Sequence, residues 1–498
     1  MKKQLYVLVA VLVAATMLLA GCGPAATTAA PATAAPATAA PATEAPTATE
    51  APAAGPVLIR WSIGIGTGAD PAQVTIENDV ANDFNASQSA IHLVIEVIPN
   101  ASARDTIATE IAAGAGPDIV GPVGWVGSNA FAGQWLDIAP YLQSTNYDTS
   151  KFESALVDMY QTEQGTVGLP FAVYPSAIWY NPKLFDEAGL DYPPASYDNL
   201  KYTLNGSEVD WNWDTMKAVA QLLTVDVNGV SSGQAGFDKT QIATYGFTFQ
   251  WEGHVEYWGT FMSNNNQLLV PGGSPGSYQA KVPDAWKTAW QWVYDGMWGD
   301  APYIPQGPVE GSADFDSGNS FASGKMAMAD MPSWYLCCVT DLTKAGGTFD
   351  FGAMPIALND TVPAGRVDAD TFRIWKGTKH PAEAFTVLTY LIDTGIQKLV
   401  VGTPDTPPAY GAIPSQTALR GPWLDSQKAA FPFVTNWDIL IAGLNYADHP
   451  SGEAFQPNMN ESWARTGTFT TLLQNTAGLD LAAEEATLES DLTAIYNK

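Results

Sequence analysis

An alternation of strand-like and helix-like segments limits the fold of this chain more than any other feature. The strand-like segments are rich in apolar or alternating residues and comprise 57–61, 92–99 and 117–120. Helical patterns separate them, one with a proline in its first turn and one followed by a glycine, and comprise 70–85 and 101–113. A strand–helix–strand–helix–strand order predicts an α/β fold with a parallel sheet.

The start of the chain has the pattern of a secretory leader, over residues 1–21. Lys2 and Lys3 precede an apolar run over 5–20, which is too short for a comfortable membrane span and is typical of a signal peptide. The run ends in Leu-Ala-Gly-Cys, which resembles a bacterial lipobox. This resemblance implies lipidation of Cys22 and an anchor at the outer face of the cell membrane, extracellular or periplasmic. The alternative is an ordinary signal peptide followed by a chance cysteine.

Residues 22–56 are predicted to be the lipidated cysteine followed by a disordered tether. The segment after Cys22 is almost wholly Ala, Pro and Thr, and prolines recur every five residues from Pro31 to Pro46. Prolines at this spacing prevent a helix, and the segment lacks the apolar bulk of a core. Fully extended, it would reach on the order of 100 Å. The folded body is therefore expected over 57–498.

The composition excludes several classes of partner. The chain has 22 Lys and Arg against 51 Asp and Glu, which gives a formal net charge of −29. A protein this acidic repels phosphate backbones, so no nucleic-acid partner is expected. Three cysteines and four histidines are too few for a disulfide framework, a Cys-rich zinc module or a His-based metal site. We therefore expect no metal and no cofactor.

Several motifs follow one another along the body in a recognisable order. They comprise residues 116–119 (GPDI), 168–176 (GLPFAVYPS), 178–190 (IWYNPKLFDEAGL), 213–216 (WDTM), 321–328 (FASGKMAM) and 379–385 (KHPAEAF). Together they resemble the extracellular solute-binding proteins of bacterial ABC importers, and among these the sugar-binding family 1, which includes maltose-binding protein. The resemblance extends from residue 57 to the C-terminus.

The resemblance implies a two-lobed fold of the periplasmic-binding-protein type (type II). Each lobe would be a mainly parallel sheet flanked by helices, with the ligand in a cleft between the lobes. The implied lobes comprise 57–173 plus 356–414 for the first and 174–355 plus 415–498 for the second. The chain is expected to cross between them near 172–176, 354–356 and 413–416.

The resemblance also implies a function. The protein would be a monomeric, lipid-anchored binding protein that takes up a mono- or oligosaccharide. Closure of the lobes on the ligand would prepare it for delivery to the transmembrane permease subunits of an ABC importer. No bond is broken in such a protein, so it is not expected to be an enzyme.

A site for a neutral sugar combines flat aromatic surfaces with fixed polar side chains, because a sugar has C–H faces and a rim of hydroxyl groups. Trp125 fits because it lies in a glycine-rich loop just after a predicted strand, where open α/β sheets bind ligands. Trp251 and Glu252 lie in an aromatic, glycine-rich stretch. Asp370 and Thr371 stand where many members of the family carry a glycine-rich turn. The alternative is a place in the core for Trp125, packing at a lobe edge for Trp251 and Glu252, and an altered loop for Asp370 and Thr371.

For three further candidates the resemblance itself implies a place in the cleft: Tyr174 in the first crossing segment, Trp334 after the 321–328 motif, and Trp463 at the head of a predicted helix. Packing in the hinge or core is the alternative for each. Cys337 and Cys338 follow Trp334 closely. They form either a vicinal disulfide or two buried free thiols, and the free thiols are preferred.

Two other functions remain open at this stage. A secreted glycoside hydrolase would need a pair of carboxyl groups roughly 5–10 Å apart, and the many Asp and Glu residues leave this open. A surface sensor or adhesin could use the same fold without a permease. The segment 272–276 matches the G-x-S-x-G pattern, but Pro271 and Ser277 flank it. A nucleophile elbow needs a strand before and a helix after the serine, so we expect a loop.

Overall fold

The computed structural model describes residues 55–162, 164–264, 266–358, 360–403, 405–448 and 451–498. The predicted leader, the lipidation site Cys22 and nearly all of the predicted tether lie outside these residues. Within the described part of the chain, no helix has both the length and the apolar character needed to cross a membrane.

The first three strands form the parallel sheet that the sequence predicts. β1 (Val57–Ile63) pairs in parallel with β2 (Ile91–Val97) and with β3 (Ile119–Val123). The connecting helices are α2 (Pro71–Ser87) and α3 (Asn100–Ala112). Helix α2 begins where expected because the Asp70 side chain accepts a hydrogen bond from the Ala72 N–H at 2.8 Å, with Pro71 in the first turn. The predicted α/β class is confirmed.

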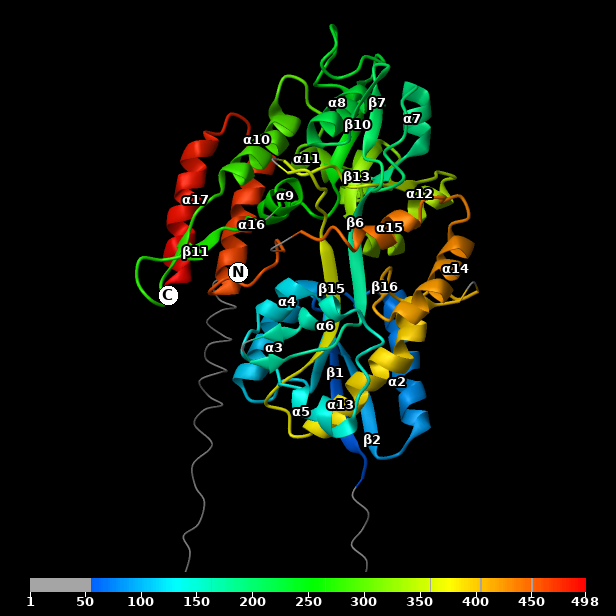
Figure 1. Ribbon diagram of the computed structural model, residues 1–498, viewed down its shortest axis with the longest axis vertical. Coiled ribbons are helices and arrows are strands. Elements are labelled where there is room, and N and C mark those ends of the chain that lie inside the picture. The colour runs from blue at the N-terminus through cyan, green and yellow to red at the C-terminus, as the bar shows by residue number, and fades with distance from the viewer. Residues whose placement is uncertain (1–54, 163, 265, 359, 404, 449–450) are drawn as a thin grey trace, which may run out of the picture. The chain divides into compact units, whose positions relative to one another are not determined.

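A long central strand, β6 (Ala172–Tyr180), joins two halves of the main sheet, whose strands lie in the order β2-β1-β3-β15-β6-β13-β10-β9. The first half of β6 pairs antiparallel with β15 (Val367–Ile374) and with β16 (Ile413–Pro414). Its second half pairs antiparallel with β13 (Met326–Pro332) and with β14 (Asp350–Gly352). In Figure 1, β6 and β15 run between the two lobes of the folded body.

The remaining elements cover these sheets and connect their strands. Between β3 and β6 lie α4 (Trp125–Asn129), α5 (Ala139–Thr145), α6 (Ser154–Asp158), β4 (Gln161–Thr162) and β5 (Gly165–Thr166). Between β6 and β13 lie α7 (Pro182–Ala188), β7 (Lys201–Leu204), β8 (Ser207–Asp210), α8 (Trp213–Leu223), β9 (Val225–Asp226), β10 (Ile242–Phe249), α9 (Val255–Met262), β11 (Leu269–Pro271), β12 (Tyr278–Ala280), α10 (Asp284–Trp298), α11 (Gly307–Glu310) and η1 (Ala313–Gly318). After β13 come η2 (Ser333–Cys337), α12 (Thr340–Lys344), α13 (Pro381–Tyr390), η3 (Leu391–Gly395), η4 (Gln397–Val401), η5 (Thr417–Leu419), α14 (Arg420–Ala430), α15 (Asp438–Gly443), α16 (Met459–Asn475) and α17 (Leu481–Tyr496).

Each lobe has its own hydrophobic core. We call the N-lobe the part that packs around Trp61 and Phe372, whose rings meet edge to face at 5.8 Å. We call the C-lobe the part that packs around Trp179 and Trp213. The C-lobe core is rich in fully buried aromatic side chains, and burial of each such ring removes a large apolar area from water. Trp286, which lies on α10, belongs to it.

The path between the lobes differs in one place from the prediction. Residues 354–356 were expected to form the second crossing, but the Ile356 N–H donates to the Trp211 carbonyl in the C-lobe at 2.9 Å. The chain returns further along, on β15, whose pairing with both β6 and β3 holds it across the boundary. The lobe boundaries as a whole remain a prediction.

Two smaller expectations can also be compared with the structure. The 272–276 segment is the loop between β11 and β12, as expected, with no strand–serine–helix arrangement around it. Cys338 is disulfide-bonded, which contradicts the preferred interpretation that this cysteine is a free thiol. Propensity could not decide this point, because both states of a cysteine suit a buried position.

Candidate functional site

A cavity of about 670 Å³ lies between the lobes, beside the strands β6 and β15 that pass from one lobe to the other. This volume is within the range that holds small-molecule ligands in proteins. From the N-lobe it is lined by Ile65, Gly66, Thr67, Gln73, Asn100, Arg104, Val123, Gly124, Val126 and Gly127. From the C-lobe and the crossing segments it is lined by Tyr174, Trp251, Tyr257, Trp334, Arg366, Asp368, Asp370, Glu453 and Trp463. Tyr410, which packs in the N-lobe core, and Gly411 after it complete the lining.

Two tryptophans form a flat face on the C-lobe side. The rings of Trp251 and Trp334 are almost parallel, at 7°, with centroids 5.9 Å apart. Trp251 is 49% exposed, although a large apolar side chain gains free energy by burial. Its backbone has φ 57°, which is uncommon for a residue other than glycine, and its indole N–H donates to the Gly318 carbonyl at 2.8 Å. An exposed ring fixed in a strained loop is typical of a binding surface.

A third aromatic group continues this side of the cavity. Trp463, in the first part of α16, stacks on the His254 ring at 4.0 Å and 8°. The Tyr257 ring meets Trp463 edge to face at 5.7 Å, and the Tyr257 hydroxyl donates to Glu453 Oε1 at 2.5 Å. Burial lowers the pKa of His254 to about 3, so its imidazole is neutral at physiological pH. Trp463 is therefore held in the wall by ring contacts with a neutral His254 and with Tyr257.

A buried guanidinium forms the floor of the cavity. Arg366 Nη1 donates to Glu252 Oε1 at 2.8 Å, and Nη2 donates to Asp368 Oδ2 at 3.0 Å and to Glu453 Oε1 at 2.5 Å. Its guanidinium carbon lies 4.6 Å from the centre of the Tyr257 ring. Arg366, Glu252 and Glu453 are all more than nine-tenths buried. Charge-assisted bonds of this kind offset the cost of burying the ions only when the geometry is good.

Carboxyl groups outnumber this guanidinium in its surroundings. Burial, together with the negative charges of Glu252 and Asp448, raises the pKa of Asp330 well above its usual range. Burial raises the pKa of Asp448 to about 6, and it raises the pKa of Glu252 although Arg366 opposes the shift. The physical cause is that an unpaired anion is costly in a low-dielectric interior. The carboxyl groups of the floor therefore either carry a net negative charge or are partly protonated.

Asp368 and Asp370 lie side by side on β15, two residues apart and hence on one face of the strand. Asp368 Oδ1 accepts from the Ala369 N–H at 2.9 Å, and Asp370 Oδ2 accepts from the Tyr174 hydroxyl at 3.3 Å. Gly124 allows both to point at the N-lobe wall, because a Cβ there would be 2.9 Å from Asp368 Oδ1 and 3.1 Å from Asp370 Oδ1. The two carboxyl groups thus lie side by side against Gly124 in the cavity wall.

The loop that carries Glu453 connects the two lobes across the cavity. Glu453 Oε2 accepts from the Val126 N–H of α4 at 3.1 Å. Its backbone carbonyl accepts from Asn129 Nδ2 at 2.9 Å. Since α4 belongs to the N-lobe and Glu453 pairs with Arg366 and Tyr257, this residue links both lobes to the floor. Such a link is available only while the lobes are close together.

Most of the predicted binding residues meet at this cavity. Tyr174, Trp251, Trp334, Asp370 and Trp463 all line it. Glu252 does not; it is fully buried behind the floor and paired with Arg366. Trp125 does not line it either, although both its neighbours do; its ring lies parallel to that of Tyr160 at 6.4 Å. A ligand contact for any of the predicted residues stays a prediction.

Five residues of the site were not predicted from the sequence: Arg366, Asp368, Tyr257, Tyr410 and Glu453. A usable signal existed for two of them: once Asp370 is placed on a strand facing a site, residues 366 and 368 share its face by the period of two. Tyr257 lay inside the aromatic stretch that drew attention to Trp251. Glu453 lies in an irregular loop between α15 and α16, where no periodic pattern marks the inward-facing residues.

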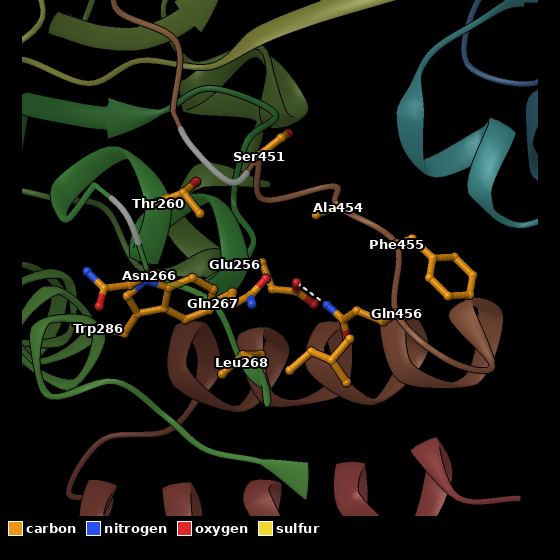
Figure 2. Close-up of a pocket in the computed structure, with 11 residues that line it drawn as sticks. Glu256, Thr260, Asn266, Gln267, Leu268, Trp286, Ser451, Ala454, Phe455 and Gln456 are labelled. Carbon is orange, nitrogen blue, oxygen red and sulfur yellow. Dashed lines mark hydrogen bonds between the residues drawn. The ribbon is translucent and has the colours of Figure 1, made fainter. Parts of the chain in front are cut away.

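A much smaller void lies beside the aromatic wall, next to Glu256 and Trp286 (Figure 2). Its volume of about 10 Å³ corresponds to a single water molecule. Figure 2 shows the side chains of Glu256 and Gln456 pointing toward one another, with Gln456 Nε2 donating to Glu256 Oε2, while Phe455 points away. Burial raises the pKa of Glu256 to about 8. This void is a packing feature of the C-lobe, too small for a solute.

Among the residues that the structure describes, no three His, Cys, Asp or Glu side chains form a group that could hold a metal ion. The carboxyl groups around Arg366 are spread along the floor and engaged with it instead.

Comparisons with known proteins define the class. The family model for bacterial extracellular solute-binding proteins matches residues 68–398. The chain belongs to this family. A binding protein of Brucella abortus (strain 2308) is 25% identical over 324 residues, which cover 63% of this chain and 67% of that protein.

Solved structures share the fold. An ABC substrate-binding protein from Listeria monocytogenes in complex with cycloalternan matches with a TM-score of 0.65 and 16% identity, covering 88% of this chain and 98% of that one. A maltose/maltodextrin-binding domain from Bdellovibrio bacteriovorus bound to maltotriose matches with a TM-score of 0.62 and 16% identity, covering 89% and 100%. The protein therefore has the two-lobed fold of periplasmic binding proteins, with the cavity between the lobes.

Proposed function

We propose that this protein binds a mono- or oligosaccharide, intact, in the cavity between the lobes. The observation that carries the proposal is the pairing of a flat, exposed tryptophan face with convergent polar groups in one cavity of suitable volume. The C–H faces of a sugar pack on indole rings, and its hydroxyl groups donate to carboxylates and accept from Asn, Gln and Arg. The ligands of the two similar structures, cycloalternan and maltotriose, agree with this ligand class.

Lobe closure is the proposed mechanism. A ligand held by both walls favours the closed state over the open one by its differential contacts. The crossing segments β6 and β15 act as the hinge, and the bonds from Val126 and Asn129 to Glu453 add to the closed state. In this proposal the hinge carries no chemical step, and the ligand leaves unchanged.

The place of the protein in the cell follows from its leader. We propose that Cys22 is lipidated and that the Ala/Pro/Thr tether lets a monomeric folded body move at the outer face of the cell membrane. From there the closed, loaded form would dock on the transmembrane permease subunits of an ABC importer. Membership of the extracellular solute-binding family supports an extracellular or periplasmic position.

A thermal-shift screen against mono- and oligosaccharides tests this function, with each hit recovered and checked for cleavage. A ligand that binds the folded state raises the melting temperature in proportion to its concentration and affinity. We expect a rise with an intact sugar, and a smaller rise in Trp334→Ala. A rise with cleavage would indicate a glycoside hydrolase instead. The absence of a shift with any sugar would refute the carbohydrate assignment.

A further inference from the structure

Asp370 is the carboxyl group of the cavity whose charge is least compensated. It is only 6% exposed, yet it lines the cavity. Among the described residues, its side chain accepts one hydrogen bond, from the neutral hydroxyl of Tyr174 to Oδ2. Oδ1 is left facing the space beside Gly124. A nearly buried carboxyl group without a cation or a strong donor is costly in a protein interior.

Within the described part of the chain, no arginine near the cavity forms an ion pair with Asp370. Arg366 forms its ion pairs with Glu252, Asp368 and Glu453, and its remaining attraction for Asp370 is weaker than the repulsion that Asp370 meets from Asp368. Arg373 points to the other side of β15, where its Nε donates to Ser128 and its guanidinium carbon lies 5.2 Å from the Tyr160 ring centre. Arg104 lines the cavity from α3 and makes no ion pair with any described residue.

The remaining neighbours of Asp370 increase the negative potential. Asp368 lies beside it on the same face of β15, and Glu453 approaches from the C-lobe loop. Tyr174 and Tyr410 contribute aromatic rings close to it. A carboxylate pair flanked by tyrosine rings suits an ammonium group, which gains both a charge-assisted hydrogen bond and attraction to the ring faces.

We propose that the solute is a carbohydrate with a protonated amino group, and that Asp370 binds this group. The inference rests on the proposed function, because it names the chemical class of the sugar in the same cavity. The ammonium group binds on the cavity side of Asp370, and the sugar ring lies against the Trp251–Trp334 face. The ligand thus supplies the cation that the protein does not direct at Asp370.

Calorimetric titration with matched pairs of sugars tests the proposal. The members of each pair differ only by one amino group in place of one hydroxyl group on each sugar unit: glucosamine and glucose, galactosamine and galactose, and a β-1,4-linked glucosamine oligomer and the cello-oligosaccharide of the same length. The titrations are run at pH 6, where the amines are protonated. We expect the amino member of at least one pair to bind at least tenfold more tightly, about 1.4 kcal/mol.

Two variants assign the preference to its residue. Asp370→Asn keeps the shape of the side chain and removes its charge; we expect it to reduce the preference to less than threefold while the hydroxyl sugar still binds. Tyr174→Phe removes the hydroxyl donor but leaves the carboxylate, so the preference persists. Asp300→Asn, at a fully exposed aspartate, removes the same charge from the surface and serves as the control.

Three results would overturn the proposal, and they are distinguishable. Equal or tighter binding of the hydroxyl sugars would refute the amino group while leaving the proposed function intact. An amine preference that survives in Asp370→Asn would refute the role of this residue. Absence of binding by every pair, with the protein folded, would refute the carbohydrate function and this inference together.

Discussion

The two walls of the cavity are built from different materials. The C-lobe wall consists of large side chains: Trp251, Tyr257, Trp334 and Trp463. The N-lobe wall consists mainly of backbone and small or flexible polar groups: Gly66, Thr67, Gln73, Asn100, Gly124 and Gly127. Glycine is needed at 127, where a Cβ would be 2.6 Å from Ile65 Cγ2 and 2.7 Å from Val123 Cγ2. The N-lobe wall can therefore approach a ligand closely, and its apolar side chains are the aliphatic Ile65, Val123 and Val126 rather than tryptophan rings.

This difference assigns different tasks to the lobes. The C-lobe wall and the floor are fixed by stacking and by the ion pairs of Arg366, so they present a ready-made surface. The N-lobe wall completes the site when it comes close, through backbone groups and the contacts of α4 with Glu453. A pre-organised surface such as the C-lobe wall supplies affinity at low entropic cost. The N-lobe wall contacts the ligand only after the lobes close, and it therefore couples binding to closure.

The largest effect should come from removing the cation of the floor. Arg366→Met leaves Glu252, Asp368 and Glu453 without their partner, and breaking a buried pair from one side costs about 3–5 kcal/mol. Urea unfolding measures the loss. Arg104→Met on the N-lobe wall is the matched variant; because Arg104 makes no ion pair with the described residues, we expect a change within about 0.5 kcal/mol. Equal losses of unfolding free energy in the two variants would show that the cavity floor is not more important for stability than the N-lobe wall.

Buried carboxyl groups in both lobes should make the stability of the protein vary with pH. Burial raises the pKa of Glu77 in the N-lobe to about 7 and that of Glu256 in the C-lobe to about 8, both above the ordinary 4.5. Between pH 4.5 and these raised pKa values, the folded protein therefore binds more protons than the unfolded chain. Their stabilising contribution is complete below pH 4.5 and is lost as the pH rises through 7 and 8. His254, with its lowered pKa, acts in the opposite direction below about pH 6.5.

Glu256→Gln should flatten this decline. One group changes the slope of the unfolding free energy by up to about 1.4 kcal/mol per pH unit, measured as urea midpoints from pH 5 to 8. Glu208→Gln, at an exposed residue of β8, is the control and should leave the slope unchanged. A slope in Glu256→Gln identical to that of the unaltered protein would show that Glu256 is ionised when folded.

The tryptophan face should affect binding more than stability. Trp251→Ala removes a half-exposed ring, so we expect at most a small change in melting temperature but about a tenfold weaker affinity for the carbohydrate. Tyr278→Ala removes a similarly exposed ring from β12, away from the cavity, and should leave affinity unchanged. Calorimetric titration distinguishes the two. Unaltered affinity in Trp251→Ala would remove this ring from the site.

How far the sequence predicts the molecule depends on the range of the interactions involved. The strands and helices of the first half of the N-lobe follow from local periodicity and from signals such as Asp70-Pro71, and the structure has them within a few residues. Aromatic candidates such as Trp334 were found because they accompany local motifs. The cavity floor was not, because Arg366 meets Glu252 and Glu453 from 114 and 87 residues away. No local pattern encodes such a meeting.

The smallest effect should come from the N-lobe contact with Glu453. Asn129→Ala removes the bond from Nδ2 to the Glu453 carbonyl, which contributes about 0.5–1.5 kcal/mol to the closed state. We expect a roughly two- to tenfold weaker affinity and a larger radius of gyration by small-angle X-ray scattering with subsaturating ligand. Asn78→Ala removes a bond within α2 and is the control. A scattering profile identical to that of the unaltered protein would show that this contact does not favour closure.

The central claim is that two unlike walls enclose one intact carbohydrate. A crystal structure with the sugar that gives the largest thermal shift tests it most directly. The account predicts a sugar ring lying on the Trp251–Trp334 face, polar contacts to Asp370, and N-lobe groups near Gly124 touching the same ligand. A sugar bound outside this cavity, or held by one wall with the other remote, would contradict it.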